Sequence, residues 1–401
     1  MQSSNAHTIS GAGYLTAVGG TLSLVNNGCF FNPANDMTVG NLSSTTGTGT
    51  FCSVTGYNIY VTGNLTVGGS GIDGYATVIM TGSGTWSGAA SAIVNLNLVI
   101  NTAGNIIVSG NVAFGATAST KTFTHTASNS FNTSGSQLTL RTCNFNSNSI
   151  LWNNVVITTT PTITLTGDLN VVGLLTMSNS ATTLNTPTGK KVYCASLTVG
   201  NNNILGTSSI EVNATGTITG AQSNFYFGLP ITFNTSGSIT LSGTLHFQGS
   251  TLTYTQGTVL HGSSTVTFSG TMAVNNTGLD LFILVLDGNS TFTSTGTFGW
   301  TAHTLQSIIG THTYNSGATY SVYSNLQLLG TLAAPIVMLT SIPGSQAYLP
   351  LSFSAIQTVG YVTAADINSA GGQTIWDWQG SLSNTTNWNP LTAPKTTSFT
   401  F

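Results

Sequence analysis

The sequence contains very little charge. Among its 401 residues, 5 are Lys or Arg and 8 are Asp or Glu, a charged fraction of 3%, against roughly a quarter in an ordinary soluble domain. Nucleic-acid binding through counterion release requires a clustered basic face. The basic residues are instead scattered, so nucleic acid is not expected as a partner; they are Lys121, Arg141, Lys190, Lys191 and Lys395.

Two kinds of hydrophobic segment are also missing. The longest strongly apolar run, LFILVL at 281–286, is far shorter than the ~18 residues that span a bilayer, so no membrane insertion is expected. The N-terminal residues MQSSNAHTIS lack the basic segment and apolar core of a secretory signal. This favours a product assembled in the cytoplasm, such as a virion part, over an exported one.

Residues typical of metal and cofactor sites are sparse. The four cysteines fit neither a metal-binding spacing nor a disulfide framework, and we expect them to be buried. A bridge between Cys29 and Cys52 stays open, because the two are about one repeat apart. The six histidines show no i, i+2 or i, i+4 pairs, and no nucleotide-binding or nucleophile motif is present. We therefore expect no metal, no cofactor and no catalytic residue.

The residues that are abundant favour strands and turns. Apolar residues make up 40% of the chain and aromatic residues 9%, which excludes a disordered chain. Glycine numbers 47 and threonine is frequent, whereas the straight-chain charged residues that fill exposed helix positions are nearly absent. The composition predicts an all-β protein.

Four segments align without gaps, which indicates an internal repeat. Residues one and three before an anchor position, and five and thirteen after it, are apolar in all four copies. A glycine stands nine residues after each anchor, where we expect the backbone to turn sharply. The segments lie at 93–114, 152–172, 229–247 and 282–300, with anchors at Asn101, Thr158, Asn234 and Asp287.

This pattern predicts a parallel β-solenoid (β-helix). Each copy is typical of two short strands with inward residues at every second position, and alone it cannot bury its inward face. The anchors are separated by 57, 76 and 53 residues, close to multiples of about 18–19 residues, the expected length of one coil. An antiparallel sandwich or barrel is the competing fold, but it does not require successive strand pairs to resemble one another.

The repeat divides the chain into four expected regions. Residues 1–34 are expected to form an N-terminal cap or the first coils, 35–300 the regular solenoid, and 301–360 less regular coils richer in Leu, Ala and Pro. Residues 361–401 hold three of the six tryptophans. This Trp-rich C-terminal region is expected to be a cap or the start of a further module, because an open solenoid end exposes unpaired strand edges.

The C-terminal region also concentrates acidic and aromatic side chains. Sugar rings stack on aromatic rings, while a carboxylate accepts hydrogen bonds from sugar hydroxyls. The sequence therefore predicts a glycan contact, for which capping of the solenoid end by the same aromatic residues is the competing interpretation. The candidate residues are Asp366, Trp376, Asp377, Trp378 and Trp388.

The rung pattern over 35–300 and the segment WDWQGSLSNTTNWNPLTAP at 376–394 carry a resemblance to known proteins. They resemble Thr/Gly-rich parallel β-solenoid proteins of bacteriophage tail fibres and bacterial cell surfaces. The resemblance implies a passive shaft or adhesive surface and no chemistry. In the large surface proteins such a segment opens a new solenoid module, which implies that the final residues KTTSFTF begin a continuation.

These features predict a non-enzymatic structural and adhesive fibre protein at a virion surface, such as a phage tail fibre. A bacterial extracellular surface adhesin or filament subunit is the first alternative, and a polysaccharide-binding or depolymerising tailspike is the second. The near absence of charge predicts self-association into trimers or filaments, with host or environmental glycan as the other expected partner. It also predicts stability that changes little with salt, or with pH between about 5 and 9.

Overall fold

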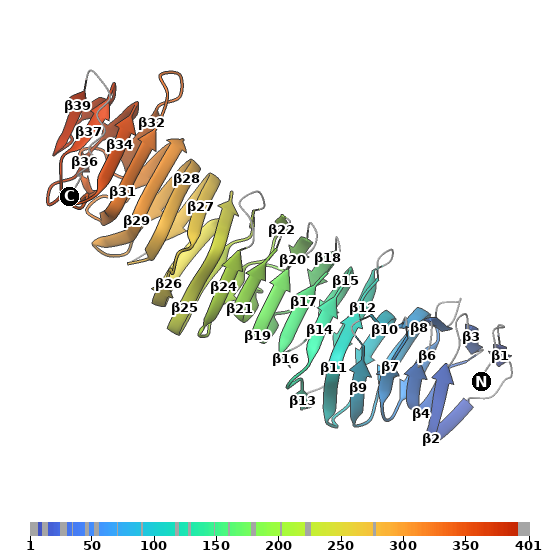
Figure 1. Ribbon diagram of the computed structural model, residues 1–401. Coiled ribbons are helices and arrows are strands. Elements are labelled where there is room, and N and C mark those ends of the chain that lie inside the picture. The colour runs from blue at the N-terminus through green and yellow to red at the C-terminus, as the bar shows by residue number, and fades with distance from the viewer. Residues whose placement is uncertain are drawn as a thin grey trace. The chain divides into compact units, whose positions relative to one another are not determined.

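The chain is all β, as the composition predicts. A computed structural model shows 68% strand, and the parallel strands stack as a β-solenoid of about 15 turns (Figure 1). No helix occurs among the described residues, and none of them therefore forms a helix long and apolar enough to cross a membrane. The structure describes residues 7–9, 15–24, 30–33, 35–44, 48–51 and 56–391, apart from 70, 90, 117–119, 127–129, 148, 159–160, 178–181, 201–202, 221–225 and 276–277.

The chain forms two compact units. The first comprises Met1–Ala195 with Leu205–Ser209, and the second Ser196–Ile204 with Ile210–Phe401. The first unit contains β1 (His7–Ile9), β2 (Leu15–Leu24), β3 (Phe30–Pro33), β4 (Met37–Ser44), β5 (Thr48–Phe51), β6 (Asn58–Val61), β7 (Leu65–Val67), β8 (Gly71–Met80), β9 (Gly84–Gly88), β10 (Ile93–Ile100), β11 (Ile106–Phe114), β12 (Lys121–His125), β13 (Phe131–Asn132), β14 (Gln137–Leu140), β15 (Cys143–Asn146), β16 (Leu151–Trp152), β17 (Asn154–Ile157), β18 (Thr162–Leu165), β19 (Leu169–Met177) and β20 (Thr182–Asn185).

The second unit carries the sites described below. Strands β21 (Val192–Val199) and β22 (Ile204–Gly206) have residues in both units. The second unit continues with β23 (Ile210–Val212), β24 (Gly216–Gly220), β25 (Ile231–Gln248), β26 (Thr251–Leu260), β27 (Thr265–Asn275), β28 (Asp280–Thr293), β29 (Phe298–Ile309), β30 (Thr311–Tyr314), β31 (Thr319–Leu329), β32 (Ile336–Thr340), β33 (Ala347–Tyr348), β34 (Ile356–Gly360), β35 (Val362–Ala365), β36 (Ile367–Asn368), β37 (Ile375–Trp378), β38 (Ser381–Ser383) and β39 (Trp388–Leu391).

The coils are longer than the expected 18–19 residues. Paired residues of neighbouring coils are often 21 apart, as for Thr244 with Thr265, Asp280 with Thr301, and Thr304 with Asn325. The offset falls to 18 between Thr265 and Ile283 and rises to 31 between Asn325 and Ile356. Because the corners differ in length, dividing the distance between two similar segments by a whole number does not give the coil length.

The alignment predicts correctly which residues point inward. It does not predict correctly which of these residues lie above one another in successive coils. All sixteen apolar positions of the four aligned copies are at most 3% exposed. However, Leu286 pairs with Phe268, which pairs with Phe247. Leu286 stands one before its anchor and Phe247 thirteen after its own, so positions that the alignment separates share one column. Several faces of a coil carry the same apolar pattern, and the alignment had matched different faces.

Stacked aromatic side chains fill much of the core. In the first unit, the rings of Phe123 and Phe145 stack with centroids 4.6 Å apart, and Trp152 lies against both. In the second, Trp300, Tyr314 and Tyr320 contact one another with centroids 5.0–6.4 Å apart. Such side chains bury the largest apolar areas and dominate core energetics, so each unit has a continuous apolar interior.

The cysteines agree with the expectation where the structure describes them. Cys143 and Cys194 are fully buried free thiols, and burial raises the pKa of each to about 12. Cys29 and Cys52 lie outside the described residues, so a bridge between them stays a prediction. The region boundaries at 34, 300 and 360 also stay predictions.

Close approach of neighbouring coils requires glycine at particular corners. Gly288 has φ +139°, and a Cβ placed on it would lie 2.5 Å from the backbone nitrogen of Gly270 in the preceding coil. Gly317 also has a positive φ, of +79°, but a Cβ there would meet no atom within 4 Å. Gly288 therefore combines backbone strain with contact to a neighbouring coil, whereas Gly317 has backbone strain alone.

We predict that Gly317→Ala lowers the free energy of unfolding by about 1–2 kcal/mol, the cost of a left-handed backbone for alanine. Gly288→Ala should cost about 1–3 kcal/mol more, because its methyl group overpacks against the neighbouring coil. Urea denaturation followed by circular dichroism measures both. Equal losses in the two variants would contradict the close stacking.

Candidate functional site

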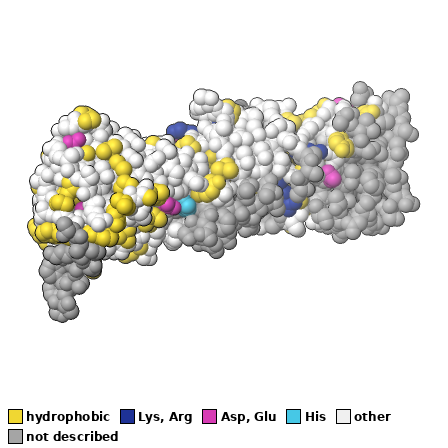
Figure 2. All heavy atoms as spheres, turned by 90° about the horizontal axis from the view of Figure 1, so that it is seen from above, with side chains coloured by type: hydrophobic (Ala, Val, Ile, Leu, Met, Phe, Trp, Pro, Cys, Tyr) yellow, Lys and Arg dark blue, Asp and Glu magenta, His cyan; other side chains and the backbone are white. Residues whose placement is uncertain are grey.

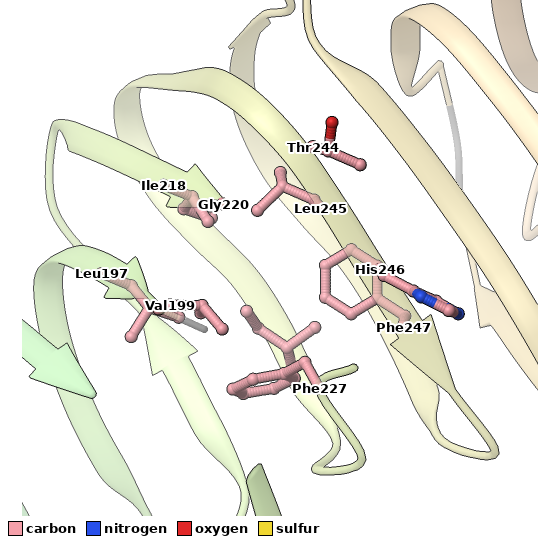
Figure 3. A pocket seen from close by; sticks show the side chains of 11 residues that line it. Leu197, Val199, Ile218, Gly220, Phe227, Thr244, Leu245, His246 and Phe247 are labelled. Atoms are coloured by element: carbon pink, nitrogen blue, oxygen red, sulfur yellow. The ribbon is translucent and has the colours of Figure 1, made fainter. Parts of the chain in front are cut away.

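An interior cavity of the second unit is too small for a ligand. Apolar side chains of β21, β24 and β25, together with Phe227, converge on this cavity of about 10 Å³ (Figure 3). That volume holds about one water molecule. Phe227 and Phe247 close it with an edge-to-face ring contact, with centroids 5.9 Å apart. This cavity therefore leaves no room for a bound partner.

Among the described residues, no three His, Cys, Asp or Glu side chains lie close enough together to hold a metal ion. The acidic side chains instead contact the protein's own polar groups. Asp168, for example, accepts a hydrogen bond from the Lys191 backbone N–H at 2.9 Å, and the Lys190 ammonium lies 3.7 Å away. Such bonds stabilise corners of the coils.

In β37, the candidate acid Asp377 lies on the opposite face from the candidate tryptophans Trp376 and Trp378. Ile375 and Asp377 are fully buried, whereas Trp376 and Trp378 are half-buried on the outer surface. Successive side chains of a strand point to opposite faces, so the Asp377 carboxyl does not lie beside either ring. Trp378 packs edge-to-face on Tyr361 with centroids 4.9 Å apart.

The two remaining candidates also belong to the fold. Trp388 is 6% exposed and pairs in register with Ile375. The Asp366 carboxylate accepts hydrogen bonds from the Gly344 backbone N–H at 2.8 Å and from the Asn384 amide, and these bonds lower its pKa. A glycan contact stays a prediction at Trp376 and Trp378. The Asp366 carboxylate is instead bonded within the protein, and the Asp377 carboxyl lies in the interior.

An aromatic ladder that sequence analysis missed lies on the outer surface of the second unit. His261 stacks on Phe282 with centroids 5.7 Å apart, Phe282 lies 5.5 Å from His303, and His303 lies 5.7 Å from Tyr323. The four residues are spaced by 21, 21 and 20 positions. A search for aromatic residues at this longer period would have found them. Because each ring contacts a ring of a neighbouring coil, the ladder mainly stabilises the stacking of the coils.

An apolar area of the surface lies on the coils after β28. Residues 288–365 contain no Asp, Glu, Lys or Arg. Figure 2 shows hydrophobic side chains gathered over the C-terminal part of the second unit. Ten large exposed ones lie in this stretch, namely Phe298, Ile308, Ile309, Tyr323, Leu329, Leu332, Ile342, Tyr348, Phe353 and Ile356.

Part of this surface forms a defined column. Ser307 pairs with Leu328, so the next residues, Ile308 and Leu329, are neighbours on successive coils. Leu329 pairs with Gly360, and Gly360 with Trp378. Leu332, which is 83% exposed, follows in the adjoining turn. We call Ile308, Leu329, Leu332 and Trp378 the apolar column.

Comparison with known proteins adds no assignment. No protein-family model, no curated protein and no solved structure matches the chain. The resemblance to tail-fibre and cell-surface solenoids therefore stays a prediction beyond the solenoid fold itself.

Asp377 and His312 are buried groups of the second unit whose shifted pKa values lie in the acidic to neutral range. Burial raises the pKa of Asp377 to about 7, since its Oδ2 has no hydrogen-bond partner and its Oδ1 receives only a 3.5 Å contact from the Val362 N–H. Burial lowers the pKa of His312 to about 4, although its Nε2 lies 2.8 Å from the Ser307 hydroxyl. Both groups are fully buried, and both favour their neutral form.

The two shifts have opposite effects on stability. The raised pKa of Asp377 gives stability that is present at low pH and is lost as pH rises from about 4 to 7. The lowered pKa of His312 gives stability that is present above about 6.5 and is lost as pH falls toward 4. Between about pH 4 and 6.5, stability falls with pH through Asp377 and rises with pH through His312. The two effects partly cancel, in agreement with the weak pH dependence of stability that the low charge predicts.

We predict that removing either titrating group reveals the pH dependence of stability that the other one causes. With Asp377→Asn, unfolding stability should rise between pH 4 and 6.5, whereas with His312→Gln it should fall between pH 4 and 7. Each slope is at most about 1.4 kcal/mol per pH unit, the value for one proton. Urea midpoints across this range measure both. Parallel profiles in the two variants would contradict the assignment.

Proposed function

We propose that this chain is a non-enzymatic structural and adhesive fibre protein at the surface of a virion, such as a tail fibre. An extracellular bacterial adhesin or filament subunit is the alternative. The supporting observation is the parallel stacking of nearly uncharged coils within each compact unit. Repeated coils build length, and their outward side chains offer an extended surface for partners.

The depolymerising tailspike receives less support. Sugar hydrolysis generally uses two carboxyl groups that both face the sugar. In the C-terminal region, the Asp377 carboxyl is fully buried and the Asp366 carboxylate is bonded to Gly344 and Asn384. Neither is presented to the outer faces of Trp376 and Trp378. The proposed function is therefore adhesion without cleavage of the polysaccharide.

Self-association is part of the proposal, and the apolar column is its contact surface. Exposed apolar patches rimmed by polar residues are typical of protein interaction sites. A contact between two copies of a surface without Asp, Glu, Lys or Arg over 288–365 desolvates no formal charge and meets no like-charge repulsion. Lateral or end-to-end association of copies therefore has a small electrostatic cost.

We predict that the double variant Leu329→Lys and Leu332→Lys raises the concentration needed for association by at least about tenfold. Each substitution removes about 1.5–3 kcal/mol of apolar burial at a contact and adds repulsion between copies. Sedimentation velocity over a range of concentrations measures the change, and cryo-electron microscopy shows whether filaments or trimers form.

The double variant Thr66→Lys and Ser109→Lys is the control matched in charge, because both are exposed strand residues outside the apolar column. It should associate as the unaltered protein does. If the unaltered protein stays monomeric at every concentration, the proposed self-association is wrong. If this control weakens association as strongly as the variant of the apolar column, total charge and not the apolar column is responsible.

A further inference from the structure

A recess on the outer surface of the second unit is large enough for a small ligand. Its volume is about 310 Å³, within the range of about 300–1,000 Å³ typical of ligand sites. Three successive coils contribute to it. The lining residues are Tyr254, Thr255, Gln256 and Gly257 of β26, Asn275 at the end of β27, and Thr295 after β28.

The recess exists because β26 takes a short path around its corner. Phe233 and Ser238 of β25 are five residues apart, but their partners Tyr254 and Thr258 are only four apart. Gly257 makes this path possible with φ +119°, and a Cβ there would lie 2.9 Å from the Thr235 carbonyl oxygen. The corner of β26 is thus one residue shorter than that of β25, and strand pairing before and after the corner keeps it in place.

A chain of hydrogen bonds orients the polar wall of the recess. The Gln256 side-chain amide donates to Asn234 Oδ1 at 3.0 Å, and the Asn234 amide donates to Glu211 Oε1 at 2.8 Å. Glu211 is only 8% exposed. Because the Gln256 nitrogen is turned toward Asn234, its carbonyl oxygen is the end left to accept hydrogen bonds at the surface.

Tyr254 provides a fixed aromatic side chain beside this wall. Its hydroxyl donates a hydrogen bond to the Gly257 carbonyl oxygen, which holds the ring against the corner and leaves the phenol oxygen able to accept a further bond. Burial raises the pKa of Tyr254, so the phenol is neutral at physiological pH. Apart from this phenol, no lining side chain is ionisable.

The chemistry of the lining selects a neutral, hydroxyl-rich ligand. Hydroxyl groups of Thr255 and Thr295 and the amide of Asn275 can each donate and accept hydrogen bonds, while an aromatic ring supplies apolar contact. An anion would meet no positive charge, and a purely apolar ligand would leave the polar groups without partners. A sugar ring has the matching combination of hydroxyl groups and apolar C–H faces.

We infer that this recess binds a neutral saccharide unit of a polysaccharide. The inference deepens the adhesive part of the proposed function and rests on it, and it places the glycan contact at Tyr254 and Gln256, apart from the predicted residues Trp376 and Trp378. Glycan binding does not depend on assembly. If the protein binds glycan but forms no filaments, only the proposed fibre role is wrong. If it forms filaments but binds no glycan, only the inference about the recess is wrong.

The test is affinity electrophoresis of the full chain through gels containing amylose, mannan or xylan, with the anionic polygalacturonate as comparator. We expect retardation by at least one neutral polysaccharide and none by polygalacturonate. Tyr254→Ala and Gln256→Ala should each lower the affinity at least tenfold. Gln327→Ala, which changes a half-buried glutamine of β31 outside the recess, should leave it unchanged.

Thr295→Trp provides a second test in case the first variants unfold. Thr295 is exposed at the rim, so the larger side chain fills the recess without entering the core, and it should also abolish retardation. Circular dichroism checks the fold of each variant. Absence of retardation in all three neutral gels, retardation by polygalacturonate alone, or unchanged binding in folded Gln256→Ala and Thr295→Trp would overturn the inference.

Discussion

Parallel pairing between successive coils is the interaction on which the rest of the structure depends. Each backbone ladder fixes which side chains lie above one another, so a residue is stabilised by neighbours that are about one coil away in sequence. The stacked rings of Phe123 and Phe145 in the core and of His261 and Phe282 on the surface have this same cause. So does the requirement for glycine at position 288, where a Cβ would meet the preceding coil.

The scarcity of charge makes the few buried polar groups important. Lys121 is 7% exposed, and its ammonium donates to the Gly74 carbonyl oxygen at 2.8 Å while lying over the Tyr75 ring. Burial instead favours the neutral forms of Asp377 and His312 by shifting their pKa values in opposite directions. The weak pH dependence that the low charge predicts therefore also depends on the balance between these two groups.

The outer surface divides into areas with different physical properties. The apolar column presents Ile308, Leu329 and Leu332 without nearby formal charge, which suits contact with an equally uncharged surface. The recess at Tyr254 and Gln256 is hollow and polar, which suits a hydroxyl-rich ligand. A rigid solenoid can carry both, because each depends on the local path of two or three coils and not on a central cavity.

The fold class and the inward residues follow from the amino-acid pattern, because a period of two along each strand is a local property. The same rule places Asp377 and Trp378 on opposite faces, a consequence that the glycan hypothesis overlooked. The three-dimensional packing of the coils sets the 21-residue spacing of Asp280 and Thr301, the pairing of Leu286 with Phe268, and the short corner at the recess. These features depend on corner lengths, which vary from coil to coil and leave no local periodic signal.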